Sequence, residues 1–353
     1  MRITFLIGNG FDLRVGMKTR FTDMYEGYIE QPSVSDSIRK FKDMLRKDAP
    51  TYKTWNDFEM AMAKKAKEFL DEGDFVSCLR DFKLYMAAYL KNEQEKFEQR
   101  KRVSIDARIL CIKETTSSIE EFYKGLRPNV VNELLRISQR GPIVYSFVSF
   151  NYTKILDNML EYTMGDVIHI HGTLGEDIVL GVDNMGQVVD LPYKTSKRFE
   201  RAFIKPEFNK NYDYSRLEKV KNIIDSSDLI CVYGMSLGNS DLSWVKRLKE
   251  WLLSDRNNHL VYFSYDERTF DKSNWDAIMD EEEDCIVSLL GTICDSSEEM
   301  DQIFEQVHIP VGYDIFSIDE ILKAEKIKTN NESRKKEALQ KQSEKRPMEI
   351  NAV

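Results

Sequence analysis

The stretch Ile3-Thr4-Phe5-Leu6-Ile7-Gly8-Asn9-Gly10-Phe11-Asp12 decides how the N-terminal part of the chain folds. Four of its first five residues are apolar, and the run ends in Gly-Asn-Gly before helix-compatible sequence. This pattern is typical of a buried parallel strand that turns into a helix. Such a turn points backbone N–H groups at a ligand, and the helix dipole favours an anion there.

Two glycines of this turn stand at positions that matter for ligand binding. Gly8 and Gly10 match the first two glycines of a dinucleotide-binding turn, where the missing side chain lets the backbone approach a phosphate. Leu13 stands where the third glycine is expected, and Gly16 comes three residues late. By itself the motif leaves two interpretations open, a phosphate-binding turn and a tight strand-to-helix turn without a ligand.

The composition indicates a soluble, globular chain. Its 353 residues suffice for one large or two ordinary domains, and 42% of them are hydrophobic and 31% charged. The net charge of -9 argues against nucleic acid as a partner of the main body. Residues 323–346 differ, because they carry nine Lys and Arg against four Glu and hardly any large apolar side chain. We expect a solvated helix or a disordered tail there, and binding of an acidic partner is the less favoured alternative.

Cysteine usage indicates a reduced, cytoplasmic setting. The five cysteines are scattered and no pair has C-x-x-C spacing, so we expect no structural zinc and no other metal. The N-terminal apolar run is broken at Gly8, which is unlike a signal peptide. No apolar stretch approaches the ~20 residues that span a bilayer, so we expect no membrane association.

Apolar spacing divides the chain into an α/β core, a helical insertion and a tail. Residues 34–140 hold little glycine and several long segments with helical apolar spacing. We therefore assign 1–33 and 141–322 to the core, 34–140 to the helical insertion, and 323–353 to a charged C-terminal tail. The Met and Tyr side chains along the insertion form either its core or a face for a homo-oligomer.

The part after the insertion alternates strands and helices. Apolar runs predict strands at 143–150, 166–170, 178–182, 229–233 and 260–264. Helices are predicted at 12–30, 154–162, 215–225 and 242–253, and an irregular segment at 185–212. This alternation is typical of an α/β fold with a mainly parallel sheet.

Polar and glycine-rich residues follow the predicted ends of five strands. They are Gly8–Asp12, Asn151, His171, Gly234–Asp241 and Asp266. In open α/β sheets, ligands bind in the crevice outside the carboxyl ends of the strands. We therefore expect these residues to line one cleft.

The residue types at these positions suit a nucleotide. Ser236 and Asn239 can contact phosphate or ribose, and Asp266 can accept a hydrogen bond from a ribose hydroxyl. Asn151 and His171 remain for chemistry, since histidine is the side chain best suited to proton transfer at neutral pH.

The chain has only four histidines, and two of them lie together in Ile168-His169-Ile170-His171. Strand alternation predicts that both histidines point to the same face of the sheet. We assign His169 a structural role, satisfied by hydrogen bonds, and His171 a functional one, because it stands at the strand end beside Gly172.

Four of these segments resemble motifs of sirtuins, in the same order along the chain. They are Gly8-Asn9-Gly10 with the later Gly16, Asn151 in Ser-Phe-Asn-Tyr-Thr, His171-Gly172, and Gly234-x-Ser236-Leu237. The resemblance implies a Rossmann-like, sirtuin-like core that binds NAD, with Asn151 and His171 at the nicotinamide ribose. The residues expected to bind the dinucleotide are Gly8, Asn9, Gly10, Phe11, Gly234, Ser236, Leu237, Asn239 and Asp266.

The chain departs from sirtuin deacylases at three points. It lacks the four-cysteine zinc module, and Thr153 replaces the acidic residue that stands two positions after the sirtuin asparagine. Asp12 replaces the small hydroxyl residue of the first loop. A deacylase is therefore disfavoured.

A closer resemblance, to the bacterial phage abortive-infection family AbiH, covers most of the chain. It rests on five blocks in order: Leu6–Leu13, Trp55-x-Asp57-Phe58-Glu59, Phe150-Asn151-Tyr152-Thr153, His169-Ile170-His171-Gly172 and Gly234-x-Ser236-Leu237. The family implies an anti-phage role and leaves the chemistry open. It also raises Glu59 to a supporting group at the site, although Trp55 and Phe58 fit ordinary helix packing equally well.

Together these observations predict an abortive-infection effector that depletes NAD by cleaving its nicotinamide–ribose bond. Asn151, His171 and Asp12 are the expected catalytic residues, with the Asp12 carboxylate stabilising positive charge on the ribose. A phage-derived trigger is compatible with this role. The first alternative is a non-catalytic nucleotide sensor that gates a partner. A nuclease ranks lower, because the sequence displays no two-metal carboxylate cluster.

Overall fold

A computed structural model of the chain describes residues 1–48, 51–139, 141–160, 164–263 and 275–344. At its centre is a six-stranded sheet with the order β3-β2-β1-β4-β5-β6, in which every neighbouring pair is parallel. Dinucleotide-binding Rossmann folds have this same order. The strands are β1 (Arg2–Ile7), β2 (Val144–Ser149), β3 (Val167–His169), β4 (Leu229–Tyr233), β5 (His259–Phe263) and β6 (Val307–His308).

Both faces of the sheet are covered by helices, which explains why its strands are continuous apolar runs. In β1, Ile3, Phe5 and Ile7 point to one face and Leu6 to the other, and all four are buried. The first face packs against α6 (Ile105–Glu120), α7 (Pro128–Ser138) and α8 (Ile155–Leu160). The second packs against α11 (Tyr214–Asp225), α12 (Leu242–Ser254), α13 (Trp275–Ile293) and α14 (Ser297–Ile303).

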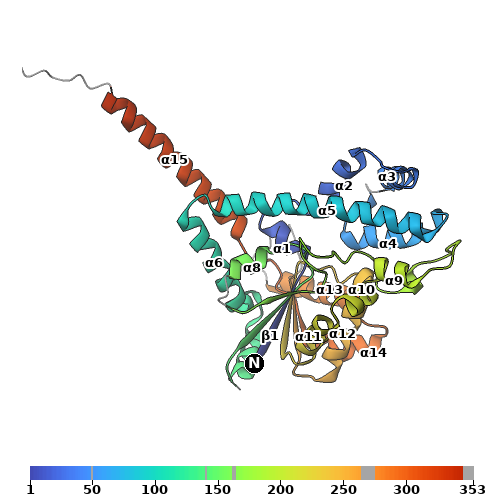
Figure 1. The fold of residues 1–353 in the computed structure, drawn as a ribbon. Helices are drawn as coiled ribbons and strands as arrows, with labels where there is room; N and C mark the ends of the chain where they lie inside the picture. Colours follow the sequence, from blue (N-terminus) through green and yellow to red (C-terminus); the bar gives the residue numbers. More distant parts are fainter. Residues whose placement is uncertain (49–50, 140, 161–163, 264–274, 345–353) are drawn as a thin grey trace, which may run out of the picture.

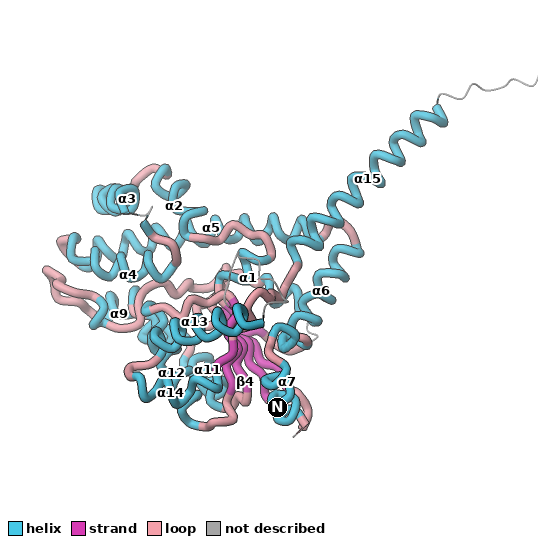
Figure 2. Tube along the Cα trace, turned by 180° about the vertical axis from the view of Figure 1, so that it is seen from behind, coloured by secondary structure: helices cyan, strands magenta, loops and turns pink. Residues whose placement is uncertain are grey.

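A separate helical layer lies over the carboxyl edge of the sheet (Figures 1 and 2). Its helices are α2 (Phe21–Glu30), α3 (Asp36–Asp48), α4 (Trp55–Lys65), α5 (Glu72–Lys101) and α9 (Lys197–Phe203), and α10 (Lys205–Tyr212) joins α9 to α11. It has its own hydrophobic core, in which Phe21 stacks on Phe58 and Phe82 packs against Phe58 at a tilt. Helix α1 (Asn9–Arg14) lies between this layer and the sheet.

The remaining helical elements are short, except for the last. The 3₁₀ turns are η2 (Ala66–Glu68), η3 (Phe122–Gly125), η4 (Met185–Gln187), η5 (Asn239–Asp241) and η6 (Phe304–Gln306). Helix α15 (Ile318–Glu344) starts in the core at Ile318 and Leu322 and then projects away from the body (Figure 1). Among the described residues, no helix has the length and apolar character to span a bilayer.

The predicted α/β fold with a mainly parallel sheet is confirmed, as are five of the six predicted strands. The prediction of a strand at 178–182 is wrong. Val182 makes only a single bridge to Ile204, and the apolar side chains of this segment pack into the core of the helical layer. The segment 185–212, predicted to be irregular, contains η4, α9 and α10.

The helix predicted over 12–30 is interrupted. Helix α1 ends at Arg14, and Gly16 has a φ of 80°, the left-handed conformation that ends helices and favours glycine. Helix α2 then starts at Phe21. The segment 34–140 contributes to two different cores, since α3 to α5 belong to the helical layer whereas α6 and α7 pack on the sheet.

Candidate functional site

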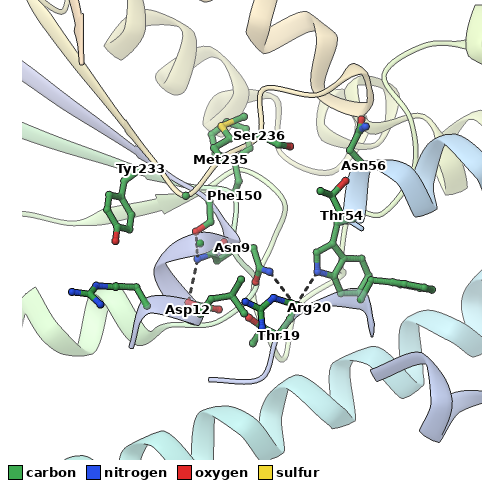
Figure 3. A pocket seen from close by; sticks show the side chains of 18 of the residues that line it. Asn9, Asp12, Thr19, Arg20, Thr54, Asn56, Phe150, Tyr233, Met235 and Ser236 are labelled. Carbon is green, nitrogen blue, oxygen red and sulfur yellow. Dashed lines mark hydrogen bonds between the residues drawn. The ribbon is translucent and has the colours of Figure 1, made fainter. Parts of the chain in front are cut away.

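A cavity of about 600 Å³ lies at the carboxyl edge of the sheet, beneath the helical layer. Ligand pockets in proteins measure about 300–1,000 Å³. The cavity opens where the β1 and β4 ends meet, the point at which the strand order reverses and α/β sheets bind ligands. Figure 3 shows Asn9 and Asp12 of one segment, with Phe150 and Ser236 of two others, around it.

The glycines of the first turn pack against the turn after β4. The Gly8 N–H donates to Tyr233 O over 2.9 Å, and the Gly10 N–H donates to Gly234 O over 2.8 Å. A Cβ atom on Gly10 would overlap Gly234 Cα, and Gly234 itself has a φ of 65°. These three glycines therefore allow two backbones to touch at the floor of the cavity, and two of the turn's N–H groups are already used within the protein.

A buried carboxylate lies beside this floor. Asp12 is 2% exposed and accepts hydrogen bonds from Asn151 Nδ2 over 3.1 Å and from Thr153 Oγ1 over 2.7 Å. The same Asn151 amide donates to Gly8 O over 3.0 Å, which ties the end of β2 to the turn after β1. Burial raises the pKa of Asp12 to about 7, against the opposing effects of Thr153, His169 and Asn151. A carboxyl group of this kind gains or loses a proton near neutral pH.

His169 supports the turn that follows β2. Its Nδ1 lies 2.9 Å from Asn151 O, and its Nε2 lies 2.9 Å from Asp157 Oδ2. It does not line the cavity. Both ring nitrogens therefore have partners within the protein, as a structural role requires.

His171 points into the cavity, because the chain turns directly after β3. The strand ends at His169, and Gly172 follows with a φ of 78°. The ring of His171 packs edge-on against Phe150, and its Nε2 lies 3.2 Å from Asp241 Oδ1 without an aligned hydrogen bond. The expected alternation of a strand does not continue through His171, so the two histidines contact different groups.

An ion cluster that the sequence did not indicate lies next to His171. The Lys205 ammonium is 2.8 Å from Glu59 Oε2 and 3.0 Å from Asp241 Oδ1. All three side chains line the cavity. The sequence did not predict Lys205 as a site residue, because its segment looked irregular. The Lys-Pro pair that opens α10 was the only local pattern indicating a helix there, since proline favours the first turn of a helix. Glu59, raised by the AbiH resemblance, lies in this cluster.

The structure brings most of the expected binding residues to the cavity. Its lining includes Gly8, Asn9, Gly10, Gly234 and Ser236, together with Asp12, Asn151 and His171. The Asn9 side chain donates to Thr19 O over 3.1 Å, as does the Trp55 indole N–H over 3.0 Å, which joins α1 to α4 (Figure 3).

Four expected binding residues lie elsewhere or cannot be placed. Phe11 is fully buried and packs edge-on against Phe316 in the hydrophobic core. Leu237 is buried with the apolar residues of the second sheet face. Asn239 is not part of the lining, and its carbonyl accepts from the Gln187 side chain. Asp266 lies outside the described residues.

Comparison with known proteins identifies a family for this chain. A family model described as "Bacteriophage abortive infection AbiH" matches residues 4–265, which is more than half of the chain. No curated protein and no solved structure matches the chain. The matched residues include every side chain of the ion cluster as well as Asp12, Asn151 and His171.

Proposed function

Because this chain belongs to the AbiH family of bacteriophage abortive infection proteins, we propose that it acts in phage defence by hydrolysing the nicotinamide–ribose bond of NAD. Loss of NAD would halt an infected cell before phage progeny are released. The proposal extends the family role, which concerns abortive infection, to a specific reaction.

The observation that carries the proposal is the position of the cavity. It lies at the strand-order reversal of a Rossmann-type sheet, where dinucleotides bind, and three candidate catalytic side chains line it. Its volume lies in the range of small-molecule sites, and its walls combine aromatic side chains with buried polar groups.

In the proposed reaction, the C1′–N1 bond of NAD breaks and a bond forms between C1′ and a water oxygen. Nicotinamide leaves with the bonding electron pair, and the water loses a proton, so the products are nicotinamide, ADP-ribose and one proton. The transition state carries positive charge on the ribose. An ionised Asp12 carboxylate in a largely water-excluded site would stabilise that charge.

His171 and Asn151 supply the remaining functions. His171 would hydrogen-bond the ribose hydroxyls or accept the proton of the attacking water, and the Asn151 amide would position the ribose or the water. Asn151 is held by Gly8 O and Asp12, so its orientation is set before a ligand binds. Such preorganisation is what positioning groups require.

The test is to incubate the purified protein with NAD and measure free nicotinamide by chromatography. The His171→Ala variant should release it about 10²–10⁴-fold more slowly, as is typical when an acid–base group is removed. The Asn151→Ala variant should also release it more slowly, because it loses a positioning group. A folded His171→Ala protein that hydrolyses NAD at the wild-type rate would contradict the assignment.

A non-catalytic nucleotide sensor that gates a partner is the second candidate. It is favoured by the internal use of the Asn151 amide and of two N–H groups in the β1 turn, which leaves fewer groups free for chemistry. Binding of NAD measured by calorimetry, without nicotinamide release in the presence of phage lysate as a source of trigger, would favour the sensor.

A further inference from the structure

Four ionisable side chains from four segments meet on one wall of the cavity. Lys205 Nζ lies between Glu59 Oε2 at 2.8 Å and Asp241 Oδ1 at 3.0 Å, and its side chain is 5% exposed. His171 Nε2 approaches the same Asp241 oxygen to 3.2 Å. Asp241 therefore stands between a permanent cation and a histidine that can become one.

Backbone contacts hold this cluster in place. Gly181 N donates to Glu59 Oε1 over 3.0 Å, and a Cβ on Gly181 would overlap Phe203 O, so only glycine fits there. The Lys205 N–H donates to Val182 O over 2.9 Å, which fixes the start of α10 beside this segment. Backbone hydrogen bonds thus hold the Glu59 side chain and the Lys205 main chain, and the two side chains also pair with each other.

Helix α4 is locked to the loop after β4 in a similar way. Ser240 N donates to Asn56 Oδ1 over 2.8 Å, and a Cβ on Gly238 would lie 2.5 Å from Asn56 Cγ. Since Asp241 follows Ser240 directly, this contact sets the distance between the Asp241 and Glu59 carboxylates. Buried polar networks with this many fixed contacts are rigid.

The two carboxylates of the cluster differ in how firmly each holds its charge. A buried carboxylate stays charged only where cations face it, since an uncompensated charge away from water is costly. Burial raises the pKa of Glu59, with Lys205 opposing it. Although burial acts in the opposite direction, Lys205 and then His171 hold the pKa of Asp241 well below its usual range. Asp241 is therefore the more acidic of the two carboxylates.

Two further titratable groups, Tyr152 and Lys83, lie near members of the cluster. Tyr152 lies beside the ring, and burial raises the pKa of its hydroxyl, which donates to Val179 O. Lys83 of α5 lies behind Glu59 and Lys205, and burial lowers the pKa of its amine to about 8. Asp241 is thus the charged group in contact with His171, whereas Lys205 acts through Asp241 and Glu59 through Lys205.

We propose that Lys205, paired with Glu59, is a positioning residue that governs how strongly Asp241 holds and charges His171. The proposal deepens the NAD hydrolysis suggested above and rests on it for its catalytic meaning. With the neutral ring protonated on Nε2, which faces Asp241 Oδ1 at 3.2 Å, Nδ1 is the base, and the Asp241 carboxylate stabilises the imidazolium that forms. Lys205 weakens this stabilisation, because it shares the same carboxylate oxygen.

The charge pattern predicts opposite effects of two substitutions. Lys205→Met leaves Asp241 without its cation, so the histidine should remain protonated to higher pH. Glu59→Gln removes the anion that competes with Asp241 for Lys205. Lys205 then pairs with Asp241 alone, so the histidine should lose its proton at lower pH. A role limited to stability would not move the titration of His171 in opposite directions.

The experiment is an NMR titration of the histidine ring protons in the full-length protein. The chain has only four histidines, so His171→Ala identifies the resonance. We expect the midpoint of His171 to move up in Lys205→Met by about one pH unit, a tenfold change in the ratio of the two forms, and down in Glu59→Gln. Lys205→Arg, which keeps the charge, should stay near wild type.

This readout separates the inference from the proposed reaction, because it requires no turnover. If the midpoints move as expected and no nicotinamide is released, the role of Lys205 stands and NAD hydrolysis fails. If NAD is hydrolysed, the acidic limb of kcat/KM should move with the midpoints. Midpoints that do not move, or that move in the same direction in both variants, overturn the inference. Should Lys205→Met not fold, Glu59→Gln decides alone by the direction of its shift.

Discussion

The titration of Asp12 can be measured directly as a change in stability. Burial raises the pKa of this carboxyl group from 3.8 to about 7. The substitution to make is Asp12→Asn, which removes the titrating proton and keeps the size of the side chain. The folded protein holds the proton more tightly than the unfolded chain does. The contribution of Asp12 to stability is therefore fully present below about pH 4 and is lost as the pH rises to about 7.

The magnitude follows from the shift in pKa. One pKa unit corresponds to about 1.4 kcal/mol. The shift from 3.8 to about 7 then predicts that the free energy of unfolding of the wild type falls by about 4 kcal/mol relative to Asp12→Asn across that window. Subtracting the variant removes the effects of groups that titrate alike in both proteins.

Urea denaturation followed by tryptophan fluorescence at several pH values measures both free energies. Thr153→Val is the matched variant, because it keeps the side-chain shape and removes the hydrogen bond that favours the charged carboxylate. The fall in its free energy of unfolding should continue to higher pH than in the wild type, because loss of this hydrogen bond raises the pKa of Asp12 further. A difference between wild type and Asp12→Asn that stays flat with pH would refute the argument, since Asp12 would then be ionised in the folded protein throughout.

Three further predictions concern stability and its separation from activity. His169→Ala should lower the thermal midpoint more than it lowers nicotinamide release per folded molecule, and the reverse ranking would give His169 a catalytic role. Gly10→Ala should destabilise the fold by about 1–3 kcal/mol in urea, because its Cβ meets Gly234. Gly291→Ala, where a Cβ meets open space on a helix, should be neutral or stabilising, and equal losses in the two variants would contradict the packing argument. Deleting 328–353 should leave the thermal midpoint nearly unchanged, since the described contact of Lys328 with Asp106 is an exposed ion pair; a large drop would show that the tail packs on the body.

Local sequence patterns were sufficient for most of the sheet. β1 and β4 are buried apolar runs that end in glycine turns, and such runs are visible without any knowledge of their neighbours. The segment 178–182 has the same apolar character but fails as a strand, because its backbone N–H groups are used by His171 O and Glu59. Whether an apolar run joins the sheet depends on the partners that the fold supplies.

The same distinction applies to the site. Asp12, Asn151 and His171 could be placed at strand ends from the sequence, since the carboxyl ends of parallel strands share one edge. Lys205 could not, because nothing in its own segment indicates burial or a carboxylate partner. It stands 146 residues from Glu59 and 36 residues from Asp241 in the chain, and its role depends on those two contacts.

The sequence by itself determined five of the six strands of the sheet, the glycine turns and the polar residues that follow them, because strand and turn propensities are properties of a few adjacent residues. Only the tertiary structure decided that Gly10 faces Gly234 rather than open space, that His171 turns away from His169 toward Asp241, and that Lys205 lies between two carboxylates. These relations depend on backbones brought together from distant parts of the chain. Burial then gives the charges their strength, because it removes the water that would otherwise screen them.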